Sequence, residues 1–222
     1  MKGLKELLVN GLDTLGIRTD EEMVFRLLAY LEELRKWNKA HNLTAIRDDR
    51  EIIEKHFLDS SLYIVKGLPP GFSTQEFWAG KKVLDVGSGA GFPGLVMKIL
   101  EPRISMWLME PSGKKAAFLR HMIRMLGLQA VEVIEASSKD YRPGESGPLF
   151  DVVVTRALFK AGEFIRQCRG FTGTGSATGG YMVMSKGPGY VEELNGIVPA
   201  PEVIPATLPF SGAKRFFLIF RA

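Results

Sequence analysis

A glycine-rich stretch that follows a short apolar segment is the feature that most constrains how this chain can fold. It covers residues 85–94 and reads DVGSGAGFPG. Glycines allow the backbone to turn tightly and to approach a ligand without a Cβ atom in the way. The helix expected after Pro93 leaves backbone amides unpaired at its N-terminus. We therefore predict a nucleotide-type cofactor site at the carboxyl end of a parallel β-strand.

The glycines match three known loop patterns unequally well. The residues from Gly89 to Gly94 have the spacing of the dinucleotide fingerprint, which is a weak signal when it stands alone. The phosphate-binding P-loop is excluded because Leu-Val follows Gly94, where that loop requires Lys and Ser/Thr. The third pattern resembles motif I of class I S-adenosylmethionine-dependent methyltransferases, and it uses Asp85, Gly87, Gly89 and Gly91.

A second acidic residue supports the third pattern. Glu110 ends the next apolar segment, 23 residues after Gly87, and an acid near that distance binds ribose hydroxyls in nucleotide-binding sheets. The alternative is a solvated glutamate that caps the next helix. Short Rossmann reductases use a Tyr-x-x-x-Lys pair, and no tyrosine of this chain is followed four residues later by lysine. A methyltransferase is therefore favoured over a dehydrogenase.

The chain from residue 81 onward alternates between apolar strand segments and amphipathic helices. This alternation predicts an α/β fold with a mostly parallel sheet and helices on both faces. The glycine- and threonine-rich residues 170–180 are expected to form a loop. The expected strands are 83–86, 105–110, 131–135, 150–155, 181–185 and 215–220, and the expected helices are 95–100 and 114–126.

The first 66 residues are expected to be helical. Thr19 and Glu22 have the spacing of a capping box, which predicts a helix that runs from there to about Lys39. A second helical stretch is expected from Asp48-Asp49. Prolines and glycines in residues 68–80 indicate a connection. We predict an N-terminal helical extension (1–67), a connection (68–80) and a Rossmann-like methyltransferase domain (81–222).

Composition and charge narrow the class of protein further. The 222 residues are 45% hydrophobic and 24% charged, as in an ordinary globular protein. A single cysteine, Cys168, excludes a disulfide framework and a cysteine-based zinc cluster, and fits a reducing, cytoplasmic setting. Residues 1–80 carry 11 basic and 13 acidic side chains (−2), whereas residues 81–222 carry 18 and 12 (+6). This basic excess allows a polyanionic partner.

Short blocks of sequence in the order of the chain resemble the bacterial 16S ribosomal RNA guanine-N7 methyltransferases, the RsmG or glucose-inhibited division protein B family. The glycine loop is one of them. The others are Asn42-Leu43-Thr44-Ala45-Ile46, Lys55-His56-Phe57-Leu58-Asp59-Ser60, Lys114-Lys115 with Phe118-Leu119-Arg120, Phe150-Asp151-Val152, Thr155-Arg156-Ala157 and Lys186-Gly187.

The resemblance implies a class I methyltransferase fold, S-adenosylmethionine as the methyl donor and a guanine in the decoding-centre loop of the small-subunit RNA as the target. Ser138 and Lys139 fall where the family contacts the adenine end, although this chain has Ala-Ser-Ser-Lys-Asp in place of the usual Arg-x-Glu run. The expected cofactor-binding residues are Asp85, Gly87, Ser88, Gly89, Gly91, Phe92, Glu110, Ser138, Lys139 and Arg156.

Other residues are candidates for contact with the RNA. Candidates near the target base are Asn42, His56, Arg156 and Lys186, and none of them is assigned as a catalytic acid or base. The cations Arg142, Arg166, Arg169, Lys214 and Arg215 could extend the RNA-binding surface, but sequence reasoning does not place them. The RNA-binding residues expected from one basic helical run are Lys114, Lys115, Arg120 and Arg124.

The expected partner is 16S ribosomal RNA or the 30S subunit, with the chain as a monomer and without a membrane segment or a metal site. Guanine N7 has a lone pair and no proton, so positioning alone could drive the transfer. Cys168 lacks the sequence context of a methyltransferase nucleophile. Two alternatives stay open: a small-molecule methyltransferase of the same fold, and a non-catalytic RNA-binding assembly factor.

Overall fold

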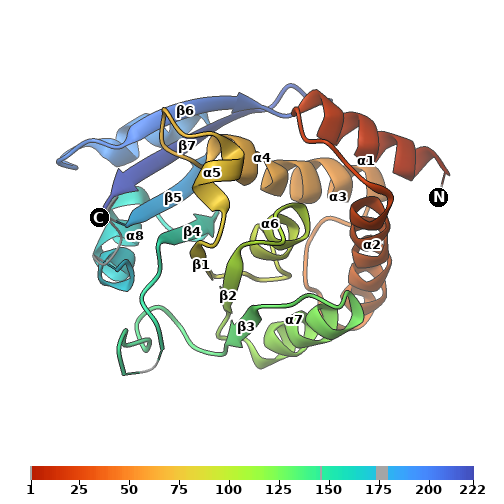
Figure 1. The fold of residues 1–222 in the computed structure, drawn as a ribbon, viewed down its shortest axis with the longest axis horizontal. Coiled ribbons are helices and arrows are strands. Elements are labelled where there is room, and N and C mark those ends of the chain that lie inside the picture. The colour runs from red at the N-terminus through yellow and green to blue at the C-terminus, as the bar shows by residue number, and fades with distance from the viewer. Residues whose placement is uncertain (1, 146, 174–179) are drawn as a thin grey trace.

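A computed structural model of the chain, which describes residues 2–145, 147–173 and 180–222, contains a seven-stranded sheet with the order β3-β2-β1-β4-β5-β7-β6 (Figure 1). Strands β1 to β5 pair with one another in parallel, and β7 is antiparallel to both β5 and β6. This confirms the mostly parallel sheet. The strands are β1 (Lys82–Val86), β2 (Ser105–Met109), β3 (Val131–Ile134), β4 (Val152–Arg156), β5 (Tyr181–Lys186), β6 (Glu202–Thr207) and β7 (Lys214–Arg221).

The order of the strands places the glycine loop at the centre of the sheet. The chain moves from β1 to β2 and β3 on one side, and then returns to add β4 and β5 on the other. The carboxyl end of β1 is therefore the topological switch point, where sheets of this type leave a crevice for a ligand. The loop of residues 87–93 begins directly after Val86, the last residue of β1.

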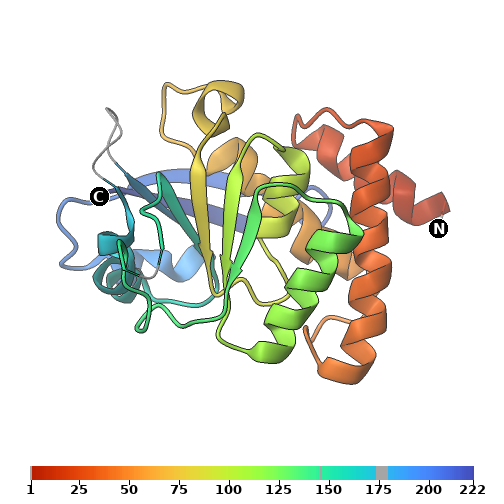
Figure 2. The same cartoon turned by 60° about the horizontal axis from the view of Figure 1, so that its bottom comes forward.

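Helices cover the two faces of the sheet unequally (Figure 2). Successive residues of a strand face opposite sides, so Val152 packs with the N-terminal helices, α6 and α7, while Val153 packs with α8. The helices are α1 (Lys2–Thr14), α2 (Glu21–His41), α3 (Asp49–Ile52), the π-helical η1 (Ile53–Leu58), α4 (Asp59–Lys66), α5 (Thr74–Trp78), α6 (Gly94–Leu100), α7 (Gly113–Met125), α8 (Ala161–Cys168) and the 3₁₀ helices η2 (Arg169–Phe171) and η3 (Pro188–Leu194).

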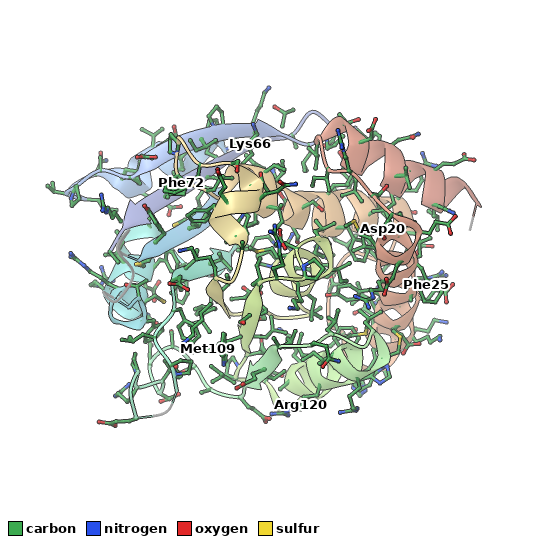
Figure 3. The ribbon with its side chains drawn as sticks, viewed as in Figure 1. Asp20, Phe25, Lys66, Phe72, Met109 and Arg120 are labelled. Carbon is green, nitrogen blue, oxygen red and sulfur yellow. The ribbon has the colours of Figure 1, made fainter. Side chains whose placement is uncertain are left out.

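The start of α2 corrects one local prediction. The N-cap is Asp20, labelled in Figure 3, and not Thr19. The Asp20 carboxylate accepts a hydrogen bond from the Met23 amide at 2.7 Å. The acidic cap is also favoured by the positive N-terminal end of the helix. A capping box does occur, but between Ser73 and Glu76 at the start of α5, within the segment predicted as a connection.

One further strand differs from the prediction, and one predicted loop lies partly outside the described residues. The edge strand β6 was not predicted. Most of the predicted loop at 170–180 falls on residues 174–179, which lie outside the described residues. In the described ranges, no helix is long and apolar enough to cross a membrane.

The N-terminal helices share one apolar core with the sheet and support the glycine loop directly. Tyr30 of α2 is fully buried, and its hydroxyl donates a hydrogen bond to the Ala90 carbonyl of the loop. Its ring stacks on Phe92 with a centroid distance of 5.2 Å. Burial raises the pKa of Tyr30 well above its ordinary value, so the hydroxyl keeps its proton and remains a donor.

Replacement of this hydroxyl tests the support that α2 gives to the loop. We expect Tyr30→Phe to lower the free energy of unfolding by about 1–3 kcal/mol, because the buried Ala90 carbonyl loses its donor. Denaturant titration with an unchanged slope would measure the loss. Tyr190→Phe on the opposite face is the matched control and should change stability by less than about 0.5 kcal/mol. Equal stability of the two variants would contradict the prediction.

Candidate active site

The loop that follows β1 can be built only with glycine at its crowded positions. Gly91 has a φ of +95°, and a Cβ atom there would lie 2.5 Å from Leu95 Cδ1 and 2.6 Å from the Tyr30 hydroxyl. Gly87 has a φ of +75°, and a Cβ atom there would lie 2.3 Å from Leu158 Cδ2. Both backbone conformations are rare for other residues. The fold therefore requires these glycines, and the loop passes close to neighbouring side chains.

A buried carboxylate lies beneath the loop. Asp85 is fully buried; its Oδ2 accepts the Gly94 amide at 2.9 Å, and its Oδ1 has no hydrogen-bond partner among the described residues. Burial, the largest effect, raises the pKa of Asp85 to about 7. The sequence pattern predicts Asp85 as a cofactor-binding residue. In the structure its side chain joins β1 to the first residue of α6, behind the loop.

Two cavities meet at this loop, and both have Gly87 and Gly89 in their walls. The first, of about 470 Å³, lies between the loop, the helical segment around His56 and the carboxyl ends of β4 and β5. The second, of about 540 Å³, lies between the loop, the end of β2 and the segment after β3. We call them the first and the second cavity. A ligand in one would therefore approach a ligand in the other at the loop.

Of the ten residues predicted to bind the cofactor, five line the second cavity and five line the first, with Gly87 and Gly89 common to both. Glu110 is buried, and its two carboxylate oxygens accept the amides of Gly89 and Ser112, each at 2.9 Å. Ser138 and Lys139 line the same cavity, and the Ser138 hydroxyl donates to Gln167 Oε1 at 2.5 Å. An acceptor carboxylate at the end of β2 suits the hydroxyls of a ribose.

The first cavity is lined by stacked rings and by two arginines, Arg156 and Arg215. His56 stacks on Phe92 with a centroid distance of 4.6 Å, and Arg156 Cζ lies 5.4 Å from the Phe92 centroid. Arg156 Nη2 donates to His56 Nδ1 at 3.0 Å, and Nη1 donates to the Lys55 carbonyl at 2.9 Å. The structure thus brings together three residues that were predicted separately, from η1, the loop and the end of β4.

The partners of His56 define its charge and tautomer. Arg156 can only donate, so His56 Nδ1 must accept and the proton must be on Nε2. Nε2 then donates to the Thr44 hydroxyl oxygen at 2.8 Å. Burial, followed by the charge of Arg156, lowers the pKa of His56 to about 3. His56 is therefore a neutral ring in the cavity wall at physiological pH.

Sequence reasoning missed one acidic residue of the first cavity. Asp59, the first residue of α4, is buried and contacts Arg156 and Arg215. Asp59 lies within a block that resembles the family, but its partners are distant in the sequence. Lys186 also lines this cavity, and its Nζ lies 2.9 Å from a carboxylate oxygen of Glu193.

Other predicted residues lie apart from this constellation. Asn42 is exposed at the C-cap of α2, with a φ of 49°. Of the basic run on α7, Lys115 lines the second cavity, whereas Lys114 and Arg124 are exposed. Arg120 lies on the outer side of α7 and pairs with Glu135 at 2.8 Å (Figure 3).

The part of the chain that the structure describes contains neither a metal cluster nor a reactive thiol. No group of three or more His, Cys, Asp or Glu side chains there could hold a metal ion. Cys168 is buried in α8, and burial raises the pKa of its thiol to about 12. A thiol of such high pKa is protonated at neutral pH and is a poor nucleophile.

The pKa of Asp85 predicts a pH-dependent stability. The unfolded aspartate loses its proton near 3.8 and the folded one near 7, so the folded chain keeps a proton that the unfolded chain releases between these values. The contribution of Asp85 to stability therefore falls as pH rises, and levels off above pH 7. Asp85→Asn is the reference variant, because its amide oxygen can still accept a hydrogen bond from the Gly94 amide but its side chain does not titrate.

We expect the unfolding free energy of the wild type minus that of Asp85→Asn to fall by roughly 4 kcal/mol between pH 4 and pH 8. Denaturant titrations of both proteins at several pH values would measure this difference. A difference that stays constant with pH would show that Asp85 is ionised throughout.

The environment of His56 predicts an NMR signature. We expect long-range ¹H–¹⁵N spectra to show His56 with its proton on Nε2 and without titration between pH 8 and pH 4.5, because its folded pKa is about 3. The denatured chain, in which histidines titrate near 6.5, is the reference. Titration of His56 near pH 6 in the folded protein would be incompatible with this geometry.

Comparison with known proteins agrees with the fold and with the sequence motifs. Residues 24–203 match the model of the GidB family, described as rRNA small subunit methyltransferase G. Relatives named ribosomal RNA small subunit methyltransferase G include proteins from Nitrosococcus oceani (33% identity, 98% of this chain and 94% of the relative) and Chromohalobacter salexigens (34%, 95% and 94%).

A solved structure supports the class I methyltransferase fold. The precorrin-6y C5,15-methyltransferase from Geobacter metallireducens superposes with a TM-score of 0.54 at 13% identity, covering 82% of this chain and 92% of that one. The resemblance predicted from the sequence blocks is confirmed by the family match, which extends over most of the chain. The protein belongs to the rRNA small subunit methyltransferase G family.

Proposed function

We propose that this protein transfers a methyl group from S-adenosylmethionine to N7 of a guanine in the decoding-centre loop of 16S ribosomal RNA. One observation carries the proposal: two cavities of different chemistry meet at Gly87 and Gly89. The second cavity offers the buried Glu110 carboxylate, and the first offers stacked rings and arginines. Membership of the rRNA methyltransferase family supports the same substrate class.

The residues of the second cavity suit an adenosine-containing donor. Glu110 would accept the ribose hydroxyls, and the polar segment at Ser138 and Lys139 would border the adenine. Gly87 and Gly89 leave the loop free of Cβ atoms where the donor meets the first cavity. When bound, S-adenosylmethionine supplies a methyl group on a positively charged sulfur. The described side chains that line the second cavity include the Glu110 carboxylate and form no metal-ligand cluster, which fits such a cofactor.

The chemistry of guanine N7 fits the residues of the first cavity. N7 carries a lone pair and no proton, so the reaction requires no general base, and orientation of the ring can supply the rate enhancement. His56 is neutral and hydrogen-bonded at both nitrogens, to Arg156 and Thr44. Its role under this proposal is to form part of a flat wall for the base together with Phe92. Aromatic walls bind extruded RNA bases in this way.

The location of basic residues favours RNA over a small molecule as the substrate. Lys55, Arg156, Lys186 and Arg215 line the first cavity, and Lys114 and Arg124 are exposed on α7. Such cations bind phosphates, and binding of this kind weakens steeply with salt. The 30S subunit or its naked 16S RNA would present both the target base and these phosphates, with the protein acting as a monomer.

Transfer of labelled methyl groups tests the proposed function. We expect the purified protein to transfer tritium from S-adenosylmethionine to 16S RNA or 30S subunits from cells that lack this modification, and digestion should yield 7-methylguanosine from one site. Glu110→Gln should weaken donor binding about tenfold or more, because a neutral amide is a weaker acceptor for hydroxyls than a carboxylate. Glu135→Gln, on the surface, is the matched control.

Binding of the donor without methylation of either RNA substrate would overturn the proposed substrate. Activity on a small molecule that is insensitive to salt would then favour the first alternative. Failure of S-adenosylmethionine to bind in calorimetry would favour an assembly factor without catalysis.

A further inference from the structure

The antiparallel strand β7 places an arginine at the same edge of the sheet as the glycine loop. Because β7 runs against β5, its first residues lie beside the carboxyl end of β5, where Lys186 pairs with Phe216. Arg215, the second residue of β7, lines the first cavity, and its side chain is 24% exposed. Lys214 precedes it and is exposed, and alternate strand residues face opposite sides.

A single buried carboxylate holds this cation and Arg156 together. Asp59 Oδ1 accepts from Arg215 Nε at 2.8 Å, and Asp59 Oδ2 accepts from Arg156 Nη1 at 3.2 Å. The Asp59 side chain is 7% exposed. The three residues come from α4, β4 and β7, so this cluster joins the N-terminal helices to the parallel and the antiparallel part of the sheet. Two arginines thus share one negative charge.

The first cavity therefore has one positive charge in excess. Among the described side chains that line it, Lys55 pairs with Glu51 at 2.7 Å and Lys186 pairs with Glu193 at 2.9 Å. His56 is neutral. Asp59 balances only one of its two arginines, so one unit of positive charge is uncompensated at a partly exposed position.

The two arginines differ in how many of their donors the protein uses. Arg156 donates to the Lys55 carbonyl, to Asp59 and to His56, and its side chain is 14% exposed. Arg215 donates to Asp59 and to the Lys214 carbonyl at 3.0 Å. A guanidinium has five N–H groups, so Arg215 keeps donors for an anion at the cavity mouth. Arg156 instead serves to position the ring of His56.

We propose that Arg215 binds a backbone phosphate of the RNA strand that carries the target base, and that Asp59 is the positioning residue that aims it. The inference rests on the proposed function and adds a specific contact to it. β7 is three strands away from β1, or about 14 Å at roughly 4.8 Å per strand, which favours the RNA over the tail of the donor. Arginine is suited to phosphate because its planar fork binds two oxygens at once.

The salt dependence of RNA binding tests this contact. We expect Arg215→Gln to weaken binding of a 16S RNA transcript about fivefold near physiological salt, and to reduce the slope of log affinity against log salt by about one, as for one lost phosphate contact. Binding of S-adenosylmethionine, measured by calorimetry without RNA, should not change. Lys214→Gln removes the same charge from the neighbouring residue on the other face, and should leave the slope nearly unchanged.

A second variant separates positioning from charge. Arg215→Lys keeps the positive charge but loses the Nε donor to Asp59 and the planar fork for a phosphate, so we expect the wild-type salt slope with a raised KM for RNA. Asp59→Asn should also raise KM for RNA more than it lowers kcat, provided that circular dichroism shows the native fold. If Asp59→Asn does not fold, the comparison of Arg215→Lys with Arg215→Gln separates the effect of positioning from the effect of charge.

Three outcomes overturn the inference. An unchanged salt slope in Arg215→Gln, or an equal change in Lys214→Gln, would exclude a specific phosphate contact. Loss of S-adenosylmethionine affinity in Arg215→Gln would assign Arg215 to the donor. If the wild type binds the transcript but methylates no guanine, the proposed function fails, and the binding slopes still decide the role of Arg215.

Discussion

The path of the backbone between β1 and α6 is the constraint on which the site depends. Contacts from two directions hold it: Asp85 accepts the Gly94 amide from below, and Tyr30 donates to the Ala90 carbonyl from α2. Gly91 fits between Leu95 and the Tyr30 hydroxyl with no room for a Cβ atom. Because the same loop forms the shared wall of both cavities, any displacement of it would change the two cavities together.

The N-terminal helices therefore do more than cover an apolar face. η1 supplies His56, α4 supplies Asp59, and the segment after α2 supplies Thr44. His56 contacts Arg156, Asp59 contacts Arg156 and Arg215, and Thr44 is hydrogen-bonded to His56; both arginines lie at strand ends of the sheet. The first cavity is thus assembled between the helices and the sheet, whereas the second cavity is built from the sheet and its loops. This division explains why a Rossmann-like sheet alone would lack the first cavity.

Sequence reasoning succeeded where a local pattern has one physical solution. Apolar runs identified the buried parallel strands, and the glycine spacing located the loop. It failed at β6, an edge strand that contains Pro205, because an edge tolerates proline and needs no continuous apolar run. It chose Thr19 as a cap where the adjacent Asp20 is used. Asp59 was missed because its partner Arg215 lies 156 residues away, on a strand whose direction no local pattern reveals.

The excess positive charge of the first cavity would affect the substrate and the product of the proposed reaction differently. Methyl transfer to guanine N7 moves one unit of positive charge from the donor side to the ring of the base. The first cavity already has one uncompensated positive charge, shared by Arg156 and Arg215 around Asp59. Like charges at short range in a partly buried site repel more strongly than in water. Under the inference above, a phosphate on Arg215 would offset this excess while the RNA is bound. Once the phosphate has left, the same charge would disfavour rebinding of the methylated base.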